Sequence, residues 1–174
     1  PRYWFQIQNK FRDEKRAKSG LLRGREFLMK DLYSFHRDEG DLDEYYEKVK
    51  KSYSEIFTMM GIGDQTYLTF ASGGTFAKYS HEFQTVTPAG EDTIYICEEC
   101  NIAINQEIIA DQKQCPKCEK TNFREEKAIE VGNIFKLKTK FSQPFKCTYK
   151  NEKGEEQDVM MGCFGMGIQR LMGT

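Results

Sequence analysis

Two stretches near the amino terminus most constrain the fold of this chain, because their side chains alternate with the period of two that a β-strand imposes. Residues 3–8 lead towards Arg12, and residues 27–35 follow after a short basic loop. Alternating runs on either side of a short loop are typical of an antiparallel hairpin. The sequence therefore predicts two paired strands that hold Arg12 and Glu14 close to Phe27.

The arginine, the carboxylate and the aromatic ring of this hairpin suit a planar, anionic ligand such as a nucleotide. A guanidinium forms paired hydrogen bonds with phosphate oxygens, and an aromatic ring offers a surface for stacking. The same residues also fit a salt-bridged surface hairpin whose inner face is apolar. The hairpin alone leaves both interpretations open.

The composition is that of a folded domain with no overall preference for polyanions. Hydrophobic residues make up 39% of the 174 residues, and the formal net charge is −1. This length fits one domain or a piece of a larger one, and a balanced charge gives no general attraction to nucleic acid or anionic membranes. The chain has no apolar run of about 18 residues and does not begin like a secretory signal. We therefore expect a cytoplasmic protein without membrane contact.

The segment from Asp41 to Met60 has the three-and-four spacing of apolar residues that indicates an amphipathic helix. Asp41 followed by Glu44 is close to a capping box, so Asp41 is expected to be the N-cap and Gly61 to end the helix. Packing alone explains the tyrosines at this spacing, which are predicted to face the core. Further strands are predicted at residues 67–71, 80–87, 93–96, 128–137, 145–149 and 157–161.

Four of the six cysteines form two pairs, each with two residues between its members. They are Cys97, Cys100, Cys115 and Cys118. Two such pairs match the tetrahedral four-sulfur coordination of structural zinc, and free or disulfide-bonded cysteines are the alternative. Four protein ligands leave no open position, so the metal is expected to stabilise a small knuckle rather than to catalyse. Cys147 and Cys163 have no such partner and are expected to be buried as small apolar residues.

Near the carboxyl end, three glycines precede Arg170 within residues 162–170. Glycine removes side chains where a ligand approaches the backbone, and a helix N-terminus followed by a cation suits a phosphate or a nucleotide. By itself this pattern does not identify a site. His81 is one of two histidines, and a lone histidine is more often structural than catalytic.

Taken in order, these segments resemble the catalytic core of the class II aminoacyl-tRNA synthetases, and among them the bacterial-type prolyl-tRNA synthetases. The run Phe11-Arg-x-Glu14, a loop, and Arg23-x-x-x-Phe27-x-x-x-Asp31 is similar to the second signature motif of that class, and residues 162–170 are similar to the third. Residues 80–83 and 129–135 are similar to segments that distinguish the prolyl enzymes. The resemblance covers most of the chain outside the cysteine region.

The resemblance implies an α+β fold, with an antiparallel sheet of roughly six strands flanked by helices and a small four-cysteine zinc knuckle inserted. Residues 1–92 would form the first part of the catalytic core, residues 93–127 the knuckle insertion, and residues 128–174 the second part. The insertion is too short for a hydrolytic domain, so no editing of mischarged alanine is expected. The opening motif and the anticodon domain of the family would lie outside residues 1–174, so we expect a catalytic-core fragment, inactive alone.

The resemblance also implies a nucleotide site and assigns its residues position by position. Arg12 would bind the α-phosphate of ATP and the carboxylate of the amino acid, and Arg23 would reach the outer phosphates. Glu14 would lie near the adenine amino group, and the adenine would stack between Phe27 and Arg170. Arg12 and Arg170, usually with Mg²⁺, would neutralise charge during the reaction, so they are the expected catalytic residues.

Further residues complete the implied site. Glu130 and Asn133 would face the ribose side of ATP, and the wall of the proline pocket would be formed by His81, Phe83 and Phe135. The implied activity is the ATP-dependent activation of proline to prolyl-adenylate and its transfer to tRNA(Pro), carried out by a homodimer in the full-length protein. The implied cofactors are ATP, Mg²⁺ and a structural Zn²⁺.

Two other functions fit the same fold. A paralogue could keep the fold and serve as a binding or regulatory module, with the zinc knuckle as its contact surface. A threonyl- or seryl-specific synthetase of the same class would keep the nucleotide motifs and activate a different amino acid.

Overall fold

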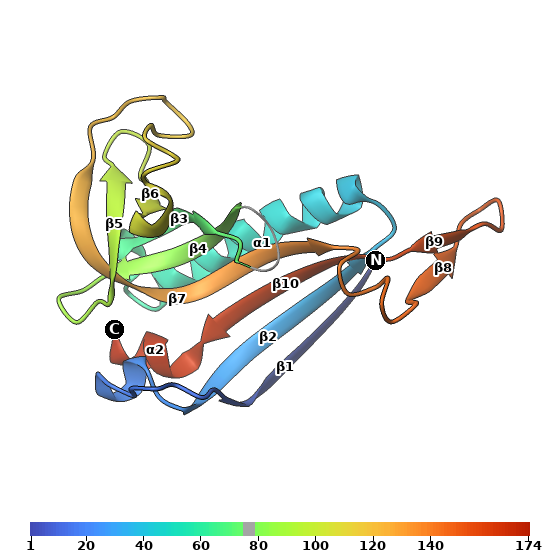
Figure 1. The fold of residues 1–174 in the computed structure, drawn as a ribbon, viewed down its shortest axis with the longest axis horizontal. Coiled ribbons are helices and arrows are strands. Elements are labelled where there is room, and N and C mark those ends of the chain that lie inside the picture. Colours follow the sequence, from blue (N-terminus) through green and yellow to red (C-terminus); the bar gives the residue numbers. More distant parts are fainter. Residues whose placement is uncertain (75–78) are drawn as a thin grey trace.

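In the computed structural model, which describes residues 1–74 and 79–174, the body of the chain is one eight-stranded sheet (Figure 1). Its strand order is β1-β2-β10-β7-β4-β3-β6-β5, and neighbouring strands are antiparallel except for the parallel pair β3 and β6. The strands are β1 (Arg2–Phe11), β2 (Glu26–His36), β3 (Thr66–Ser72), β4 (Tyr79–Val86), β5 (Asp92–Cys97), β6 (Ile102–Asn105), β7 (Arg124–Lys138) and β10 (Met160–Gly167). A separate hairpin contains β8 (Thr148–Lys150) and β9 (Glu156–Asp158).

The described residues also form two α-helices and three short 3₁₀ turns. The α-helices of the described residues are α1 (Glu39–Met59) and α2 (Ile168–Gly173), and short 3₁₀ turns form η1 (Gly20–Leu22), η2 (Gly63–Gln65) and η3 (Gln106–Ile108). Within residues 1–74 and 79–174, no helix is long and apolar enough to cross a membrane.

The predicted hairpin at the amino terminus is present. β1 and β2 pair antiparallel along their length, with Lys10 opposite Phe27. The pairing extends one step beyond the strands, because the Arg12 amide donates a hydrogen bond to the carbonyl oxygen of Arg25 at 2.8 Å. Strand pairing therefore places Arg12 beside Phe27.

Helix α1 begins earlier than predicted. Its N-cap is Asp38, whose Oδ1 accepts a hydrogen bond from the Asp41 amide at 2.8 Å. The prediction of Asp41 as the N-cap is wrong, because Asp38 has the extended backbone of a cap and Asp41 lies inside the first turn, where its charge favours the helix dipole. The predicted end is confirmed, since the helix stops at Met59 and Gly61 has a φ of +80°.

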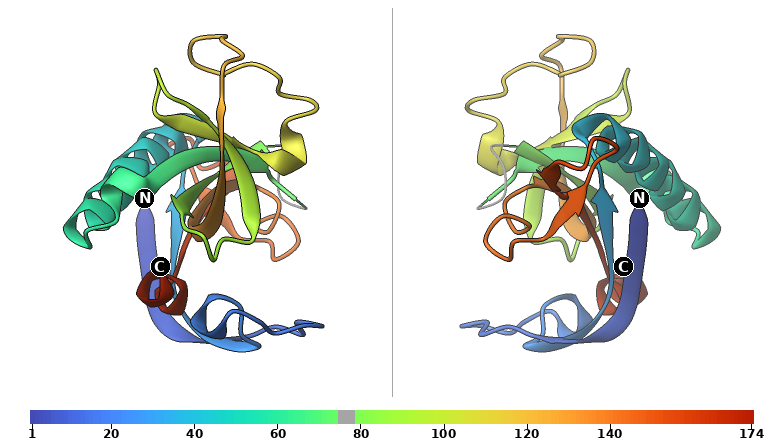
Figure 2. Two further views of the ribbon diagram at one scale, coloured as in Figure 1. Left: turned by 90° about the vertical axis from the view of Figure 1, so that its left-hand side faces the viewer. Right: turned by 90° about the vertical axis from the view of Figure 1, so that its right-hand side faces the viewer.

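The apolar side of α1 packs on one face of the sheet, as its periodicity predicts. The Phe83 ring on β4 packs against the rings of both Tyr53 and Phe57, with centroid distances of 5.3 and 5.2 Å. Ile134 of β7 and Phe164 of β10 are fully buried in the same cluster. Figure 2 shows α1 on one side of the sheet and the β1–β2 loop reaching to the other side. The sheet therefore has a face covered by α1 and an open face beside that loop.

The sheet has more strands than the resemblance implies, because strands of the cysteine region join it. β6 pairs with β3, and β5 pairs with both β6 and the first residues of β7. β7 begins at Arg124, four residues before the predicted strand at Ala128, and its first part turns towards the cysteine region in Figure 1. A second apolar cluster fills this end of the sheet and contains Tyr67, Ile94, Ile96, Ala103 and Ala128.

Candidate functional site

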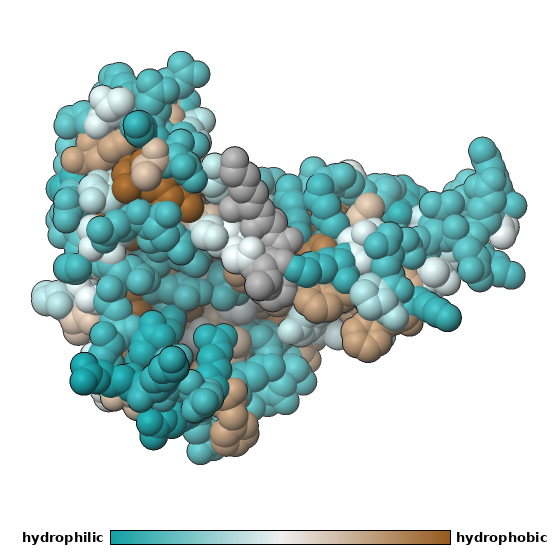
Figure 3. Space-filling view, in the orientation of Figure 1, coloured by the Kyte–Doolittle hydropathy of each residue, from teal (hydrophilic) through white to brown (hydrophobic). Residues whose placement is uncertain are grey.

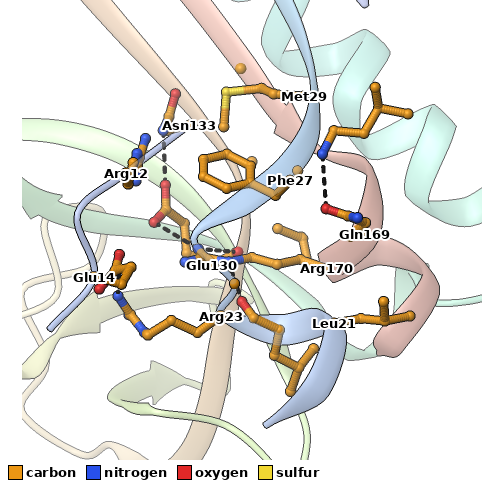
Figure 4. Close-up of a pocket in the computed structure, with 17 residues that line it drawn as sticks. Arg12, Glu14, Leu21, Arg23, Phe27, Met29, Glu130, Asn133, Gln169 and Arg170 are labelled. Atoms are coloured by element: carbon orange, nitrogen blue, oxygen red, sulfur yellow. Dashed lines mark hydrogen bonds and ion pairs between the residues drawn. The ribbon is translucent and has the colours of Figure 1, made fainter. Parts of the chain in front are cut away.

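A cleft lies where the β1–β2 loop, β7, β10 and α2 meet (Figure 4). Its lining contains all seven residues that the resemblance assigns to ATP, namely Arg12, Glu14, Arg23, Phe27, Glu130, Asn133 and Arg170. These residues come from segments far apart in the sequence, and strand pairing brings the segments together. The surface over the β1–β2 loop is hydrophilic (Figure 3), as expected where a charged ligand enters.

A local irregularity of β7 turns two of these side chains into the cleft. Residues three apart on a regular strand point to opposite faces. The register between β4 and β7 shifts beside Phe83 and Gln84, so that both Glu130 and Asn133 line the cleft. The Asn133 Nδ2 then donates a hydrogen bond to Glu130 Oε1 at 2.9 Å.

Arg12 and Phe27 form one wall of the cleft. The Arg12 guanidinium carbon lies 5.1 Å from the centroid of the Phe27 ring, within the range of a cation–π contact. Phe27 is the second residue of β2, so its ring is carried by a paired strand rather than by the flexible part of the loop. The Phe27 ring is therefore held in place before any ligand arrives, and the exposed Arg12 guanidinium lies over it.

Arg170 also lines the cleft and is fixed by three contacts. Its Nε donates to the carbonyl oxygen of Leu22 at 2.9 Å, and its Nη1 donates to the carbonyl oxygen of Glu130 at 3.0 Å. The Glu130 carboxylate lies 3.3 Å from the same Nη1. The neighbouring Gln169 accepts a hydrogen bond from the Leu28 amide at 2.8 Å, which ties α2 to β2. The short helix is thus anchored so that Arg170 faces the cleft.

Arg23 is oriented by two carboxylates. Its Nε forms an ion pair with Glu91, and its Nη1 lies 3.3 Å from Glu14 Oε1. The hydrogen bond to Glu91, together with the charges of Glu91 and Glu14, raises the pKa of Arg23 above its ordinary value. Glu91 was not predicted, because it lies in a turn without a motif and meets Arg23 across 68 positions of sequence.

The structure does not bring the residues assigned to the proline pocket into this cleft. Phe83 is only 2% exposed and is part of the core under α1. His81 lies on the same face of β4, where its Nδ1 is 2.7 Å from the Tyr46 hydroxyl. Phe135 follows Asn133 by two positions on β7 and so lies on the face of the cleft, but it does not line the cleft. Of these three side chains, only Phe135 lies on the open face of the sheet, which is the face that carries the cleft.

Between His81 and Phe83, the sequence reasoning passed over Glu82. Burial, followed by the charge of Glu130, raises the pKa of Glu82 to about 8. The carboxylate accepts a hydrogen bond from Gln84 at 3.0 Å. Alternation along the predicted strand 80–87 places Glu82 on the opposite face from His81 and Phe83. That placement could have identified Glu82 as a carboxylate on the open face of the sheet.

The four paired cysteines converge at the far end of the sheet. Their sulfur atoms all lie within 4.8 Å of one another, and Cys97 Sγ is 3.6 Å from Cys118 Sγ. This separation is too long for a disulfide, and it is close to the separation of about 3.8 Å between two thiolates of a tetrahedral zinc site with Zn–S bonds of about 2.3 Å. The donor set and its spacing therefore fit zinc.

The two cysteine pairs share the same turn geometry. In the first pair, the amide of Asn101 donates to the carbonyl oxygen of Cys97 at 2.8 Å, and in the second, the amide of Glu119 donates to that of Cys115 at 2.9 Å. Asn101 and Glu119 both have positive φ angles, of 54° and 61°. Two matching turns thus present the four sulfurs to one point, in an arrangement that could hold a metal ion.

The comparison with protein families assigns the fold. Residues 1–174 match the sequence model of the tRNA synthetase class II core domain (G, H, P, S and T). The chain belongs to this family of class II synthetase cores. The predicted fold class is thereby confirmed, and the four-cysteine cluster is consistent with the predicted knuckle.

Relatives of this synthetase core carry names that specify proline. The chain is 40% identical to the probable mitochondrial proline--tRNA ligase of Mus musculus, over 99% of this chain and 36% of that protein. It is 37% identical to the proline--tRNA ligase of Sulfurimonas denitrificans, over 97% of this chain and 43% of that protein. A crystal structure of prolyl-tRNA synthetase from Cryptosporidium parvum has the same fold, with a TM-score of 0.69 at 13% identity, over 98% of this chain and 28% of that chain. The chain thus spans less than half of these proteins.

Proposed function

We propose that this chain is the catalytic core of a proline--tRNA ligase, which activates proline with ATP and transfers the prolyl group to tRNA(Pro). The observation that carries the proposal is the cleft, which gathers every predicted nucleotide contact from separate segments. A salt-bridged surface hairpin would not need Arg170 of the distant α2 to line the same cleft as Phe27. The names of the relatives favour proline over threonine or serine.

The proposed first step joins the proline carboxylate to the α-phosphorus of ATP, and pyrophosphate leaves in line. Arg12 would bind the α-phosphate and the carboxylate, and Arg23 would bind the outer phosphates. Charge neutralisation and positioning then carry the catalysis, and no side-chain base is required. Magnesium would be held by the phosphates together with the Glu130 carboxylate of the cleft, which offers the hard oxygen ligands it prefers. It would further neutralise the leaving pyrophosphate.

The base of ATP would stack between the Phe27 ring and the Arg170 guanidinium. Both side chains line the cleft and both are already immobilised, one by a strand and the other by hydrogen bonds. A desolvated stacking and cation–π arrangement of this kind contributes about 1 to 2 kcal/mol. Glu14 would accept from the adenine amino group, and Glu130 with Asn133 would face the ribose.

For the amino acid, the open face of the sheet favours Phe135 as a wall of the proline pocket. His81 and Phe83, on the face under α1, were assigned to that pocket by the resemblance, and a direct role for them requires a rearrangement of β4. The homodimer and the cytoplasmic location are also part of this proposal. The relatives from Mus musculus and Rattus norvegicus are named as mitochondrial.

The proposal predicts an amino acid dependence of pyrophosphate exchange. In the full-length protein, proline is expected to support ATP–pyrophosphate exchange, and threonine and serine are expected to give background rates. Exchange that depends on threonine or serine would assign a different specificity. Absence of exchange with all three amino acids would favour the binding or regulatory paralogue.

The cysteine cluster predicts a resident metal. Protein purified without added zinc is expected to contain about one zinc per chain, and Cys115→Ser is expected to lose it and to unfold at a lower temperature, because structural zinc contributes directly to folding. The matched control is Cys147→Ser, since Cys147 is an exposed cysteine outside the cluster. Metal analysis and thermal unfolding measure both effects. Less than about half a zinc per chain in the parent protein would contradict the site.

A further inference from the structure

The turn that leads into the cysteine region lies against the nucleotide cleft. Residues 87–91 connect β4 to β5, and β5 ends at Cys97. The turn is fixed to β7, because the Thr87 amide donates to the carbonyl oxygen of Lys127 at 3.0 Å, and it is closed by a hydrogen bond from the Gly90 amide to Thr87 at 2.9 Å. Its position relative to the sheet is therefore determined by backbone contacts.

Gly90 allows an unusually close approach to β7. A Cβ atom at this position would lie 2.5 Å from the backbone nitrogen and oxygen of Ala128, which is closer than side chains and backbone approach in proteins. Only glycine fits without moving the turn or the strand. The tight contact places the next residue, Glu91, under the β1–β2 loop.

Glu91 is buried between two cations of that loop. One carboxylate oxygen pairs with Arg23, and the other lies 3.3 Å from Lys18 Nζ. The side chain is only 9% exposed. Burial alone would raise the pKa of Glu91, but the contacts with Arg23 and Lys18 outweigh it and lower that pKa. The carboxylate is thus charged and held in one orientation at neutral pH.

This pairing determines which donors of Arg23 are left for a ligand. A guanidinium has five N–H donors in a planar fork. Glu91 uses one and Glu14 uses another, which leaves three of the five. Arg23 lines the cleft, whereas Glu91 does not. The Glu91 carboxylate therefore orients Arg23 from outside the cleft, and the remaining N–H donors of Arg23 are left for the ligand.

We propose that Glu91 is a positioning residue for ATP: it holds Arg23 ready for the outer phosphates and links the base of the cysteine region to the nucleotide site. The inference rests on the proposed function, because it assigns Arg23 to ATP. A partner that orients a binding group lowers the cost of ordering that group when the ligand arrives. Loss of such supporting partners at metal sites lowers binding or activity by about tenfold or more.

The test compares nucleotide and proline affinities in the full-length protein. Glu91→Gln keeps the shape of the side chain and removes its charge. It is expected to raise the KM for ATP in proline-dependent exchange, and the Kd for ATP by direct titration, by about tenfold. The KM for proline is expected to change less than twofold. A merely structural role would instead lower the unfolding temperature and affect both substrates alike.

A double-mutant cycle shows whether Glu91 acts through Arg23. If it does, adding Glu91→Gln to Arg23→Ala causes no further loss of ATP affinity. Additive effects, or an ATP affinity of Glu91→Gln within twofold of the parent, would overturn the proposal. The matched control is Glu44→Gln, which removes one partner of an exposed ion pair with Lys48 on α1. If the parent protein shows no proline-dependent exchange, the proposed function fails, and the direct titration of ATP still decides the role of Glu91.

Discussion

Replacing Arg170 with alanine in the full-length protein is expected to lower proline-dependent pyrophosphate exchange by about 10²- to 10³-fold, the usual loss when one preorganised charge-stabilising donor is removed. The arginine is fixed by Leu22 and Glu130 before the nucleotide binds, so no binding energy is needed to order it. The variant also leaves the Glu130 carboxylate in the cleft without its cation.

Two measurements separate this loss of chemistry from a loss of folding. The free energy of unfolding of Arg170→Ala should fall only modestly, because the helix α2 remains attached through Gln169 and the buried Leu171. Arg37→Ala is the matched control, since it removes an exposed arginine that pairs with Asp38 away from the cleft. Exchange by Arg170→Ala within about threefold of the parent rate would contradict the assigned role of the arginine.

The parts of the fold that depend on local patterns were predictable from the sequence. Alternation predicted the pairing of β1 with β2, and the helical period predicted the face of α1 that enters the core. The first residue of α1 was not predictable by the same rule, because Asp38 and Asp41 both satisfy a capping pattern. Cys147 also differs from its expectation, since it is exposed rather than buried. Short-range signals identify elements more securely than their ends or their burial.

The cleft itself depends on contacts that no local pattern contains. Arg170 meets Leu22 across 148 positions and Glu130 across 40. The register shift on β7 that places Glu130 and Asn133 on one side cannot be read from their spacing, which indicates opposite faces. The resemblance to a known family supplied these residues, and the geometry explains how they come together.

In the cysteine region too, local spacing was predictive and the pairing between distant segments was not. Spacing predicted the four ligands and the metal they suit, and their sulfurs do converge. The pairing of β5 with β7 and of β6 with β3 was not predicted, because short strands at the edges of an insertion can pair with each other or with the main sheet. The region therefore shares strands and a buried cluster with the core.

Phe83→Ala is expected to lower the free energy of unfolding by about 3–5 kcal/mol, which is the cost of removing a large aromatic side chain from a well-packed core. The ring is 2% exposed and contacts Tyr53 and Phe57 of α1. Its loss leaves a cavity at the contact between the helix and β4. Denaturant unfolding monitored by circular dichroism measures the change, and Met59→Ala on the exposed side of α1 is the matched control.

A second substitution at the same position separates the core role of Phe83 from the proline-binding role that the resemblance assigned to it. Phe83→Leu keeps an apolar side chain of similar size, so it should fold and lose only about 1 to 1.5 kcal/mol of stability. Because the ring faces α1 and not the open face of the sheet, the KM for proline should then stay within about twofold of the parent value. A rise of tenfold or more in that KM, with little change in stability, would show that proline reaches Phe83 and that β4 rearranges in the working enzyme. The change in the KM for proline therefore shows whether the β4 face under α1 only packs in the core or also contacts the bound proline.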